Sequence, residues 1–102
     1  MIKSICRKNR EGYIMFRLWG RIFEKNRLIR DVIISDDSSD SRTAKVVHAL
    51  AAVCQEFDLA QPIWLDSNIR EFQVCSKTRF HADHFIEQID FDYLEISILE
   101  ED

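Results

Sequence analysis

The chain has 102 residues and a formal net charge of −4; 46% of its residues are hydrophobic and 31% are charged. This length suits one modest hydrophobic core, so we expect a single domain over residues 1–102. Only 2 Gly and 1 Pro occur, and with this hydrophobic content they exclude a collagen-like, linker-rich or disordered chain.

Cysteine usage and the N-terminal charges indicate the compartment. The three cysteines are odd in number and form no CxxC pair, which argues against a disulfide scaffold and against a zinc ribbon. Basic side chains recur at Lys3, Arg7, Lys8 and Arg10, so the apolar run of a signal peptide cannot form there. No apolar stretch approaches the roughly 18 residues that a membrane span needs. We therefore predict a cytoplasmic protein with reduced thiols.

The first part of the chain predicts a three-stranded antiparallel meander. Residues 2–6 are rich in apolar side chains, residues 13–23 alternate with period two, and residues 28–35 are rich in β-branched side chains. Alternation of this kind is typical of a strand with one covered face. The connections are short, and residues 24–27 suit a hairpin loop, which favours antiparallel neighbours.

Three helices are predicted after the meander. The first carries a single apolar stripe at helical spacing. Its members are Val46, Val47, Leu50, Val53, Cys54 and Phe57. Asn68-x-x-Glu71 has the spacing of a capping box and predicts a short helix to about Cys75, although this segment would also fit a strand. The third predicted helix covers residues 82–89.

Residues 92–99 alternate again and predict a last strand, with Leu94, Ile96 and Ile98 facing the core. The predicted fold is therefore α+β. It consists of a four-stranded antiparallel sheet, made of the three-stranded N-terminal meander plus the C-terminal strand, with about three helices packed on one face. The order of the strands stays open at this stage.

Helices on one side leave the other face of such a sheet open to water or to a partner. On the strand over residues 13–23, that face carries Tyr13, Met15, Arg17, Trp19 and Arg21. These residue types are enriched at protein interfaces, with Trp and Arg foremost among the energetically dominant ones. We predict a non-catalytic interaction module that self-associates through this face, or that binds another protein there. The alternative is that long arginine stems and connecting segments cover the face.

The same mixture of aromatic and basic side chains permits a second function, the binding of single-stranded nucleic acid. Residues 1–30 contain nine basic and two acidic side chains, a net charge of +7. Residues 31–102 carry a net charge of −11, which opposes this interpretation, and no RNA-binding signature is present. Alternatively, the two parts of the chain pack together and neutralise each other.

Enzymatic and metal chemistry find little support. The chain has no glycine-rich phosphate loop or nucleophile elbow, and Cys54 lies on the buried stripe. His81, His84 and Glu87 follow one another at three-residue spacing along the predicted third helix, and imidazole and carboxylate groups are normal metal ligands. This spacing is not a recognised metal motif. We therefore predict no cofactor and no metal centre, with these three residues as the only weak candidates.

Several short segments of the C-terminal half stand out together. They are Pro62-Ile63-Trp64-Leu65, Phe72, Thr78-Arg79-Phe80, Asp83-His84-Phe85-Ile86-Glu87 and Ile89-Asp90-Phe91-Asp92-Tyr93-Leu94-Glu95-Ile96. With these segments the chain resembles a group of short bacterial proteins that have no established activity. The resemblance implies a bacterial cytoplasmic protein of about this length, and it implies no catalytic residue or cofactor.

Overall fold

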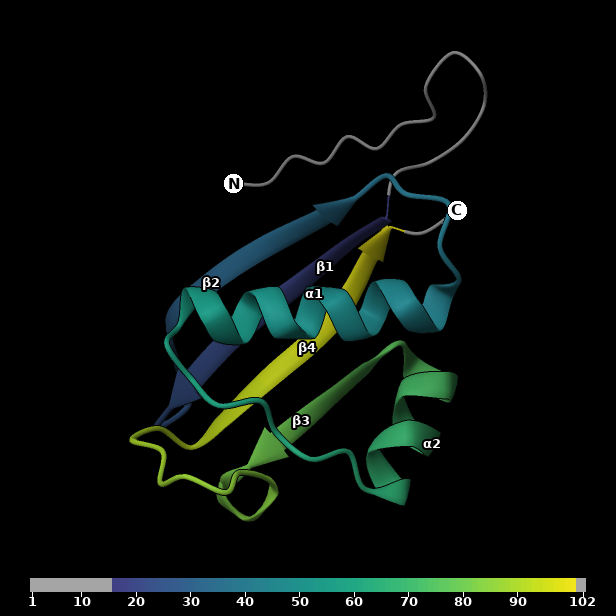
Figure 1. Cartoon of the computed structure of the whole chain (residues 1–102). Coiled ribbons are helices and arrows are strands. Elements are labelled where there is room, and N and C mark those ends of the chain that lie inside the picture. Colours follow the sequence, from purple (N-terminus) through teal and green to yellow (C-terminus); the bar gives the residue numbers. More distant parts are fainter. Residues whose placement is uncertain (1–15, 101–102) are drawn as a thin grey trace.

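A four-stranded antiparallel sheet forms the centre of the molecule. The computed structural model describes residues 16–100. The strands are β1 (Phe16–Glu24), β2 (Arg27–Asp36), β3 (Lys77–His81) and β4 (Tyr93–Glu100). They lie in the order β2-β1-β4-β3, so β1 and β4 are the central strands (Figure 1). Every neighbouring pair is antiparallel, which confirms the predicted sheet type.

Two α-helices pack on one side of this sheet. Helix α1 (Arg42–Glu56) crosses the sheet obliquely, and α2 (Asp66–Cys75) lies beside β3 (Figure 1). A single 3-10 turn, η1 (Ala82–His84), follows β3. Within the part of the chain that the structure describes, neither α-helix has the length and apolarity that crossing a membrane requires. The predicted α+β class is confirmed.

Two finer predictions about the elements are wrong. The third helix over residues 82–89 is absent, because only η1 is helical there and the chain then turns irregularly toward β4. Phe85 is buried against Phe91, with ring centroids 6.2 Å apart, whereas the next residue, Ile86, is 83% exposed. The structure also contains the strand β3, in a segment where the sequence predicted no strand. The predicted strand over residues 2–6 lies outside the described residues, so the described part of the meander is the β1–β2 hairpin.

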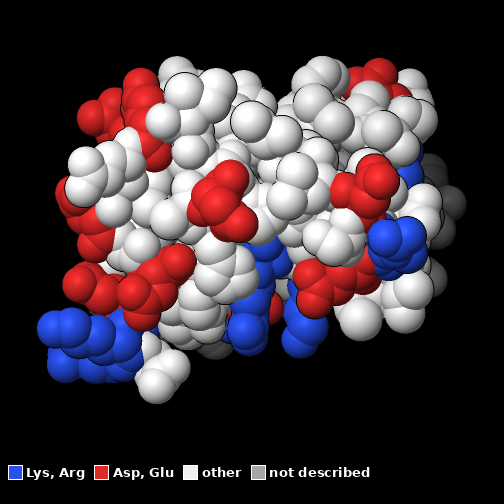
Figure 2. Space-filling model, turned by 90° about the horizontal axis from the view of Figure 1, so that it is seen from below, with Lys and Arg blue, Asp and Glu red and all other residues white. Residues whose placement is uncertain are grey.

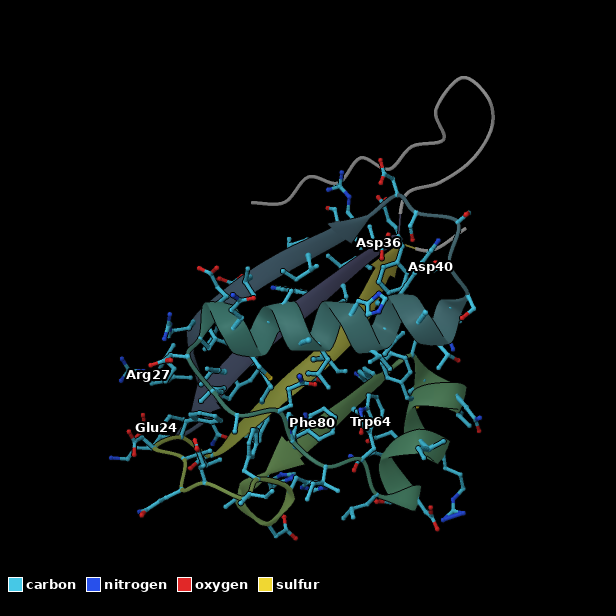
Figure 3. The ribbon with its side chains drawn as sticks, in the orientation of Figure 1. Glu24, Arg27, Asp36, Asp40, Trp64 and Phe80 are labelled. Atoms are coloured by element: carbon cyan, nitrogen blue, oxygen red, sulfur yellow. The ribbon has the colours of Figure 1, made fainter. Side chains whose placement is uncertain are left out.

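The hairpin turn between β1 and β2 lies within residues 24–27, where the sequence predicted a loop. Lys25 and Asn26 both have positive φ, 54° and 65°, the signature of a two-residue turn whose twist matches that of the flanking strands. Glu24 and Arg27 are paired across it at one end of the sheet (Figure 3). The carboxylate of Asp92 accepts a hydrogen bond from the Lys25 backbone N–H at 2.8 Å, which ties the turn to the segment before β4.

The core lies between the sheet and α1. On β1, Phe16, Leu18 and Ile22 are buried and alternate with side chains on the opposite face, as predicted. The apolar stripe of α1 is confirmed except at Val47, which is 47% exposed. Lys45, which does not belong to this stripe, is also buried, with Nζ 6.0 Å from the centroid of the Phe16 ring. The long aliphatic stem of a lysine allows such burial beside an apolar ring.

Polar side chains cap the start of α1. Ser41 is the N-cap, and its Oγ accepts a hydrogen bond from the Ala44 backbone N–H at 3.2 Å. Earlier in the loop, Asp36 accepts a hydrogen bond from the Ser38 N–H at 2.8 Å. Hydrogen bonds from Ser38 lower the pKa of the Asp36 carboxyl group. Asp36 and Asp40 lie near the start of α1 in Figure 3, and Asp40 approaches His48 with an O···N distance of 3.9 Å.

The sequence placed Asn68 at the start of a helix, but the N-cap of α2 is Leu65 and Asn68 is three residues inside it. The Asn68 side chain reaches back to accept a hydrogen bond from the Leu65 N–H at 3.0 Å. Its amide also donates to Thr78 Oγ1 at 2.9 Å and to the Arg79 carbonyl at 3.0 Å. Asn68 therefore holds α2 against β3. Beneath α1, Trp64 and Phe80 pack edge to face, with ring centroids 5.2 Å apart (Figure 3).

Candidate interaction surface

The face of the sheet opposite α1, here called the outer face, is organised in three rows of four residues. Antiparallel pairing places residues that are partners in register on the same face. Read from β2 to β3, the rows are Asp31–Arg21–Glu95–Arg79 (the charged row), Ile33–Trp19–Ser97–Lys77 (the Trp19 row) and Leu28–Phe23–Tyr93–His81 (the Tyr93 row).

The charged row alternates in sign across the whole sheet. Glu95 is at its centre and only 4% exposed, because arginine side chains flank it on both sides. Arg21 Nη2 lies 3.2 Å from Glu95 Oε1, and Arg79 Nε lies 3.9 Å from Glu95 Oε2. A buried carboxylate is tolerated only when it is paired in this way. The outer face is therefore electrostatically balanced within one chain.

Two residues of the charged row, Asp31 and Arg21, contact the Trp19 side chain. Its indole Nε1 donates a hydrogen bond to Asp31 Oδ2 at 2.9 Å. The guanidinium carbon of Arg21 lies 4.1 Å from the centroid of the Trp19 ring, within the range of a cation–π contact. These two contacts restrict the Trp19 side chain, so it loses little conformational freedom when a partner covers it.

The Tyr93 row extends the aromatic surface toward the hairpin end of the sheet. The rings of Phe23 and Tyr93 stack with centroids 5.2 Å apart, and the His81 ring lies 5.4 Å from that of Tyr93. The guanidinium carbon of Arg79 lies 4.6 Å from the Tyr93 ring centroid. Aromatic side chains from three strands thus form a continuous surface beside the charged row.

The structure places Arg17, Trp19 and Arg21 on the outer face, as predicted. Tyr13 and Met15 lie outside the described residues. Arg79 and His81 also lie on the outer face, where the sequence predicted no strand and therefore no interface residue. Their signal was the alternation of exposed and apolar side chains over Lys77–His81, which at five residues is short enough to pass for loop.

The basic N-terminal and acidic C-terminal parts of the chain meet on this face. Arg17 and Arg21 on β1 pair with Glu100 and Glu95 on β4, with N···O distances of 3.6 and 3.2 Å. This finding supports the expectation that the two parts neutralise each other. Seen from below, the molecule carries acidic side chains spread over the visible face, and basic side chains gather mainly in its lower half (Figure 2). The charge asymmetry of the sequence is thus partly cancelled by folding.

The three weak metal candidates do not share a helix. His81 is the last residue of β3, His84 belongs to η1, and Glu87 lies in the irregular segment that follows. His84 Nδ1 accepts a hydrogen bond from the His81 backbone N–H at 3.0 Å and lies 3.1 Å from Asp83 Oδ1. Among residues 16–100, no three His, Cys, Asp or Glu side chains form a group suited to a metal ion. The prediction that these three residues lie along one helix is therefore wrong.

Two cavities lie on the helical side of the molecule. The first, of about 310 Å³ between α1 and α2, is lined mainly by apolar side chains, together with Arg42, Thr43 and Gln73. None of the described residues that line it carries a carboxylate, an imidazole or a thiol. The second, of about 470 Å³ near the end of α1, is lined by both apolar and acidic side chains. Glu24, Asp58, Glu87 and Asp90 are its carboxylates.

The cysteines of the described region are poorly arranged for nucleophilic chemistry. Cys54 is 1% exposed on the buried side of α1, and this burial raises the pKa of its thiol to about 11. A thiol is a much weaker nucleophile than its thiolate, so Cys54 behaves as a small apolar core residue. Cys75 is exposed at the end of α2 and forms no disulfide bond.

Comparisons with known proteins return no relative. No protein-family model matches the chain, and no curated protein or solved structure is significantly similar to it. The resemblance to short bacterial proteins therefore stays a prediction, and a functional proposal rests on the geometry of the outer face.

Proposed function

We propose that this chain is a non-catalytic interaction module that self-associates through its outer face. The observation that carries the proposal is the position of Trp19 on the central strand β1, on a sheet face that no helix of residues 16–100 covers, where Asp31 and Arg21 hold its side chain. Large aromatic and arginine side chains at the centre of a surface are the ones that contribute most to binding. On the outer face they come from neighbouring strands of one rigid sheet.

The size of the outer face suits a specific interface. The nine residues of β1 span about 30 Å at about 3.3 Å per residue, and four strands span about 19 Å. The footprint is thus on the order of 500 Å², before the relief of the side chains is added. Standard interfaces bury about 800 Å² of accessible surface on each partner. The flat footprint is smaller than this standard, so the outer face alone suits a small interface and a modest dimer.

Charge pairing within the chain favours a protein partner over nucleic acid. Arg17 and Arg21 already face Glu100 and Glu95, and Asp31 and Glu95 would lie close to an approaching phosphate backbone. Nucleic-acid affinity depends on basic side chains that are available to neutralise phosphates. A protein surface, in contrast, can cover paired charges at a lower desolvation cost than unpaired ones.

The test is the solution mass of the chain, measured by size-exclusion chromatography with light scattering over a range of concentrations. The wild type should approach twice the monomer mass of 12.1 kDa as concentration rises. Trp19→Ala should weaken the association at least about 30-fold, as loss of an aromatic anchor does, and leave the far-UV CD spectrum unchanged. Val74→Ala is the matched control, because Val74 is an 82% exposed apolar side chain on α2.

A second variant guards against a folding defect in Trp19→Ala. Ser97 lies beside Trp19 in the same row, and Ser97→Arg would add a bulky charged side chain without removing an aromatic contact. It should also dissociate the dimer. A monomeric wild type, or a dimer that both variants leave intact, would overturn the proposal. A monomer that binds single-stranded oligonucleotides through Arg17 and Arg21, more weakly at high salt, would establish the nucleic-acid function instead.

A further inference from the structure

The charged row has a pattern that is complementary to itself. From β2 to β3 it contains Asp31, Arg21, Glu95 and Arg79, so the signs run negative, positive, negative, positive. Reversing the order of the strands gives the opposite sign at every position. A second copy of the row, laid over the first in reverse strand order, therefore places an opposite charge above each residue.

Symmetry restricts how two copies can meet through the outer face. Homodimers are mostly two-fold symmetric, and two faces are brought against each other only by an axis that lies in the plane of the interface. An axis perpendicular to the strands and passing through the charged row would place Asp31 over Asp31 and Arg21 over Arg21 of the second copy. Juxtaposed like charges at an interface repel each other strongly, which disfavours that arrangement. An axis parallel to the strands reverses the strand order and pairs opposite charges.

The two other rows agree with the parallel axis. When the axis runs between β1 and β4, each β1 residue lies over the β4 residue of the same row. Trp19 then covers the small Ser97 of the second copy, and Phe23 meets its Tyr93. A large side chain over a small one allows close packing, and two aromatic rings stack favourably. The central pairs of all three rows are therefore compatible with the same axis.

We infer that two copies of this chain pair face to face about a two-fold axis that runs parallel to the strands, between β1 and β4. This inference rests on the proposed self-association and adds its geometry. Arg21 opposes Glu95 of the second copy near the axis, and Asp31 opposes its Arg79 at the edges. Two packed sheets are rotated relative to each other by about 30°. Residues on the edge strands lie about 7 Å from the axis, so this rotation shifts each of them by about 4 Å relative to its partner in the second copy. An arginine side chain spans that displacement.

Charge reversal at the edge pair tests the axis. In the Asp31→Arg homodimer the new arginine would oppose Arg79, and in the Arg79→Asp homodimer the new aspartate would oppose Asp31. Each variant should dimerise at least about 100-fold more weakly than the wild type. An equimolar mixture should restore a one-to-one heterodimer, because opposite charges then meet at both edges. Native mass spectrometry distinguishes the heterodimer from both homodimers.

The matched controls carry the same charge changes on the helical side. Glu56→Arg on α1 and Arg70→Asp on α2 alter exposed residues away from the outer face. Each should keep the wild-type dimer, and their mixture should show no preference for the heterodimer. If the wild type is monomeric, the proposed self-association and the axis both fail. If the wild type is dimeric but Asp31→Arg and Arg79→Asp stay dimeric, or their mixture does not form heterodimers, only the axis fails.

A cross-linking experiment decides the geometry without altering the charged row. Under the inferred axis, Ile33 on β2 lies opposite Lys77 on β3 of the second copy, whereas a perpendicular axis keeps β2 over β2. With the exposed Cys75 replaced by serine in both variants, a bismaleimide linker of about 10 Å, the spacing of packed sheets, should join Ile33→Cys chains to Lys77→Cys chains. Peptide mapping by mass spectrometry should locate the link between positions 33 and 77. Links between two copies of position 33 would overturn the inferred axis.

Discussion

Gly20 on β1 faces Val53 on α1 across the core, and the two residues are closely packed. A Cβ atom on Gly20 would lie 2.6 Å from Val53 Cγ1 and 2.9 Å from Val53 Cγ2. Ordinary carbon–carbon contacts lie near 3.5–4.0 Å. Val53 is fully buried, so its side chain cannot avoid the added atom by turning into solvent. The absence of a side chain on Gly20 therefore allows the close approach of Val53 to β1.

We expect Gly20→Ala to lower the free energy of unfolding by about 1–3 kcal/mol, the usual cost of overpacking a core. Val53→Ala alone should cost about 2 kcal/mol through loss of buried methyl groups. The double variant should be more stable than the sum of the two losses predicts, by at least about 1 kcal/mol, because the new methyl group occupies the space that the valine leaves. Urea denaturation of the four proteins measures this coupling.

The control for this cycle is Ser35→Ala, an exposed position on β2, which should change stability by less than about 0.5 kcal/mol. Strictly additive effects of Gly20→Ala and Val53→Ala would contradict the contact between them. Because both residues lie in the core, their substitution should act on the folding of each chain and leave the outer face chemically unchanged.

Asn68 should be among the most sensitive polar residues of the chain. Its side chain makes three hydrogen bonds, to the Leu65 N–H, to Thr78 Oγ1 and to the Arg79 carbonyl, and it is 4% exposed. We expect Asn68→Ala to lower the unfolding free energy by about 2–4 kcal/mol, because it leaves buried polar groups without partners. Urea denaturation monitored by tryptophan fluorescence measures the loss, since Trp64 packs against Phe72 of the same helix.

Gln73 provides the matched comparison for Asn68. It is an exposed amide on α2, so Gln73→Ala should change the stability by less than about 0.5 kcal/mol. Asn68→Asp keeps the acceptor for Leu65 but removes both donated hydrogen bonds and buries a charge, so it should not rescue the loss. A loss for Asn68→Ala as small as that of Gln73→Ala would show that the network contributes little.

The two described cysteines should differ strongly in reactivity. With its pKa raised to about 11 by burial, Cys54 exposes little thiolate at neutral pH. We expect iodoacetamide at about pH 8 to modify the exposed Cys75 at least about 100-fold faster than Cys54 in the folded protein. Peptide mapping by mass spectrometry assigns the label to each site. Denaturation should bring the two rates together, and equal rates in the folded protein would show that Cys54 is accessible.

Local periodicity was sufficient for the elements that lie on a single continuous face. The alternation in β4 and the apolar stripe of α1 placed Leu94, Ile96 and Val53 in the core, and the structure confirms all three. The alternation in β1 likewise placed Arg17, Trp19 and Arg21 on the opposite face of the sheet. Such patterns need only the chain neighbours of a residue, because the geometry of a strand or helix repeats every two or 3.6 residues.

Short segments were ambiguous because their structure depends on contacts with distant parts of the chain. Residues 82–89 hold apolar side chains at spacings that suit a helix, yet Phe85 turns inward and Ile86 outward as the chain bends toward β4. In Lys77–His81 the alternation covers only five residues, and the strand is formed because β4 offers a free edge. Contacts between distant segments overrode local preference at both places.

The sequence by itself determined that this protein is an α+β domain with an aromatic and basic strand face turned away from its core. Only the tertiary structure decided which side chains share that face. Asp31 and Arg79 are far apart in the chain, and the order β2-β1-β4-β3 places both in one row, at its two ends. Register between strands depends on long-range pairing, and a shift of one residue would turn every side chain of a strand to the other face. The self-complementary pattern of charges therefore exists only in the folded sheet.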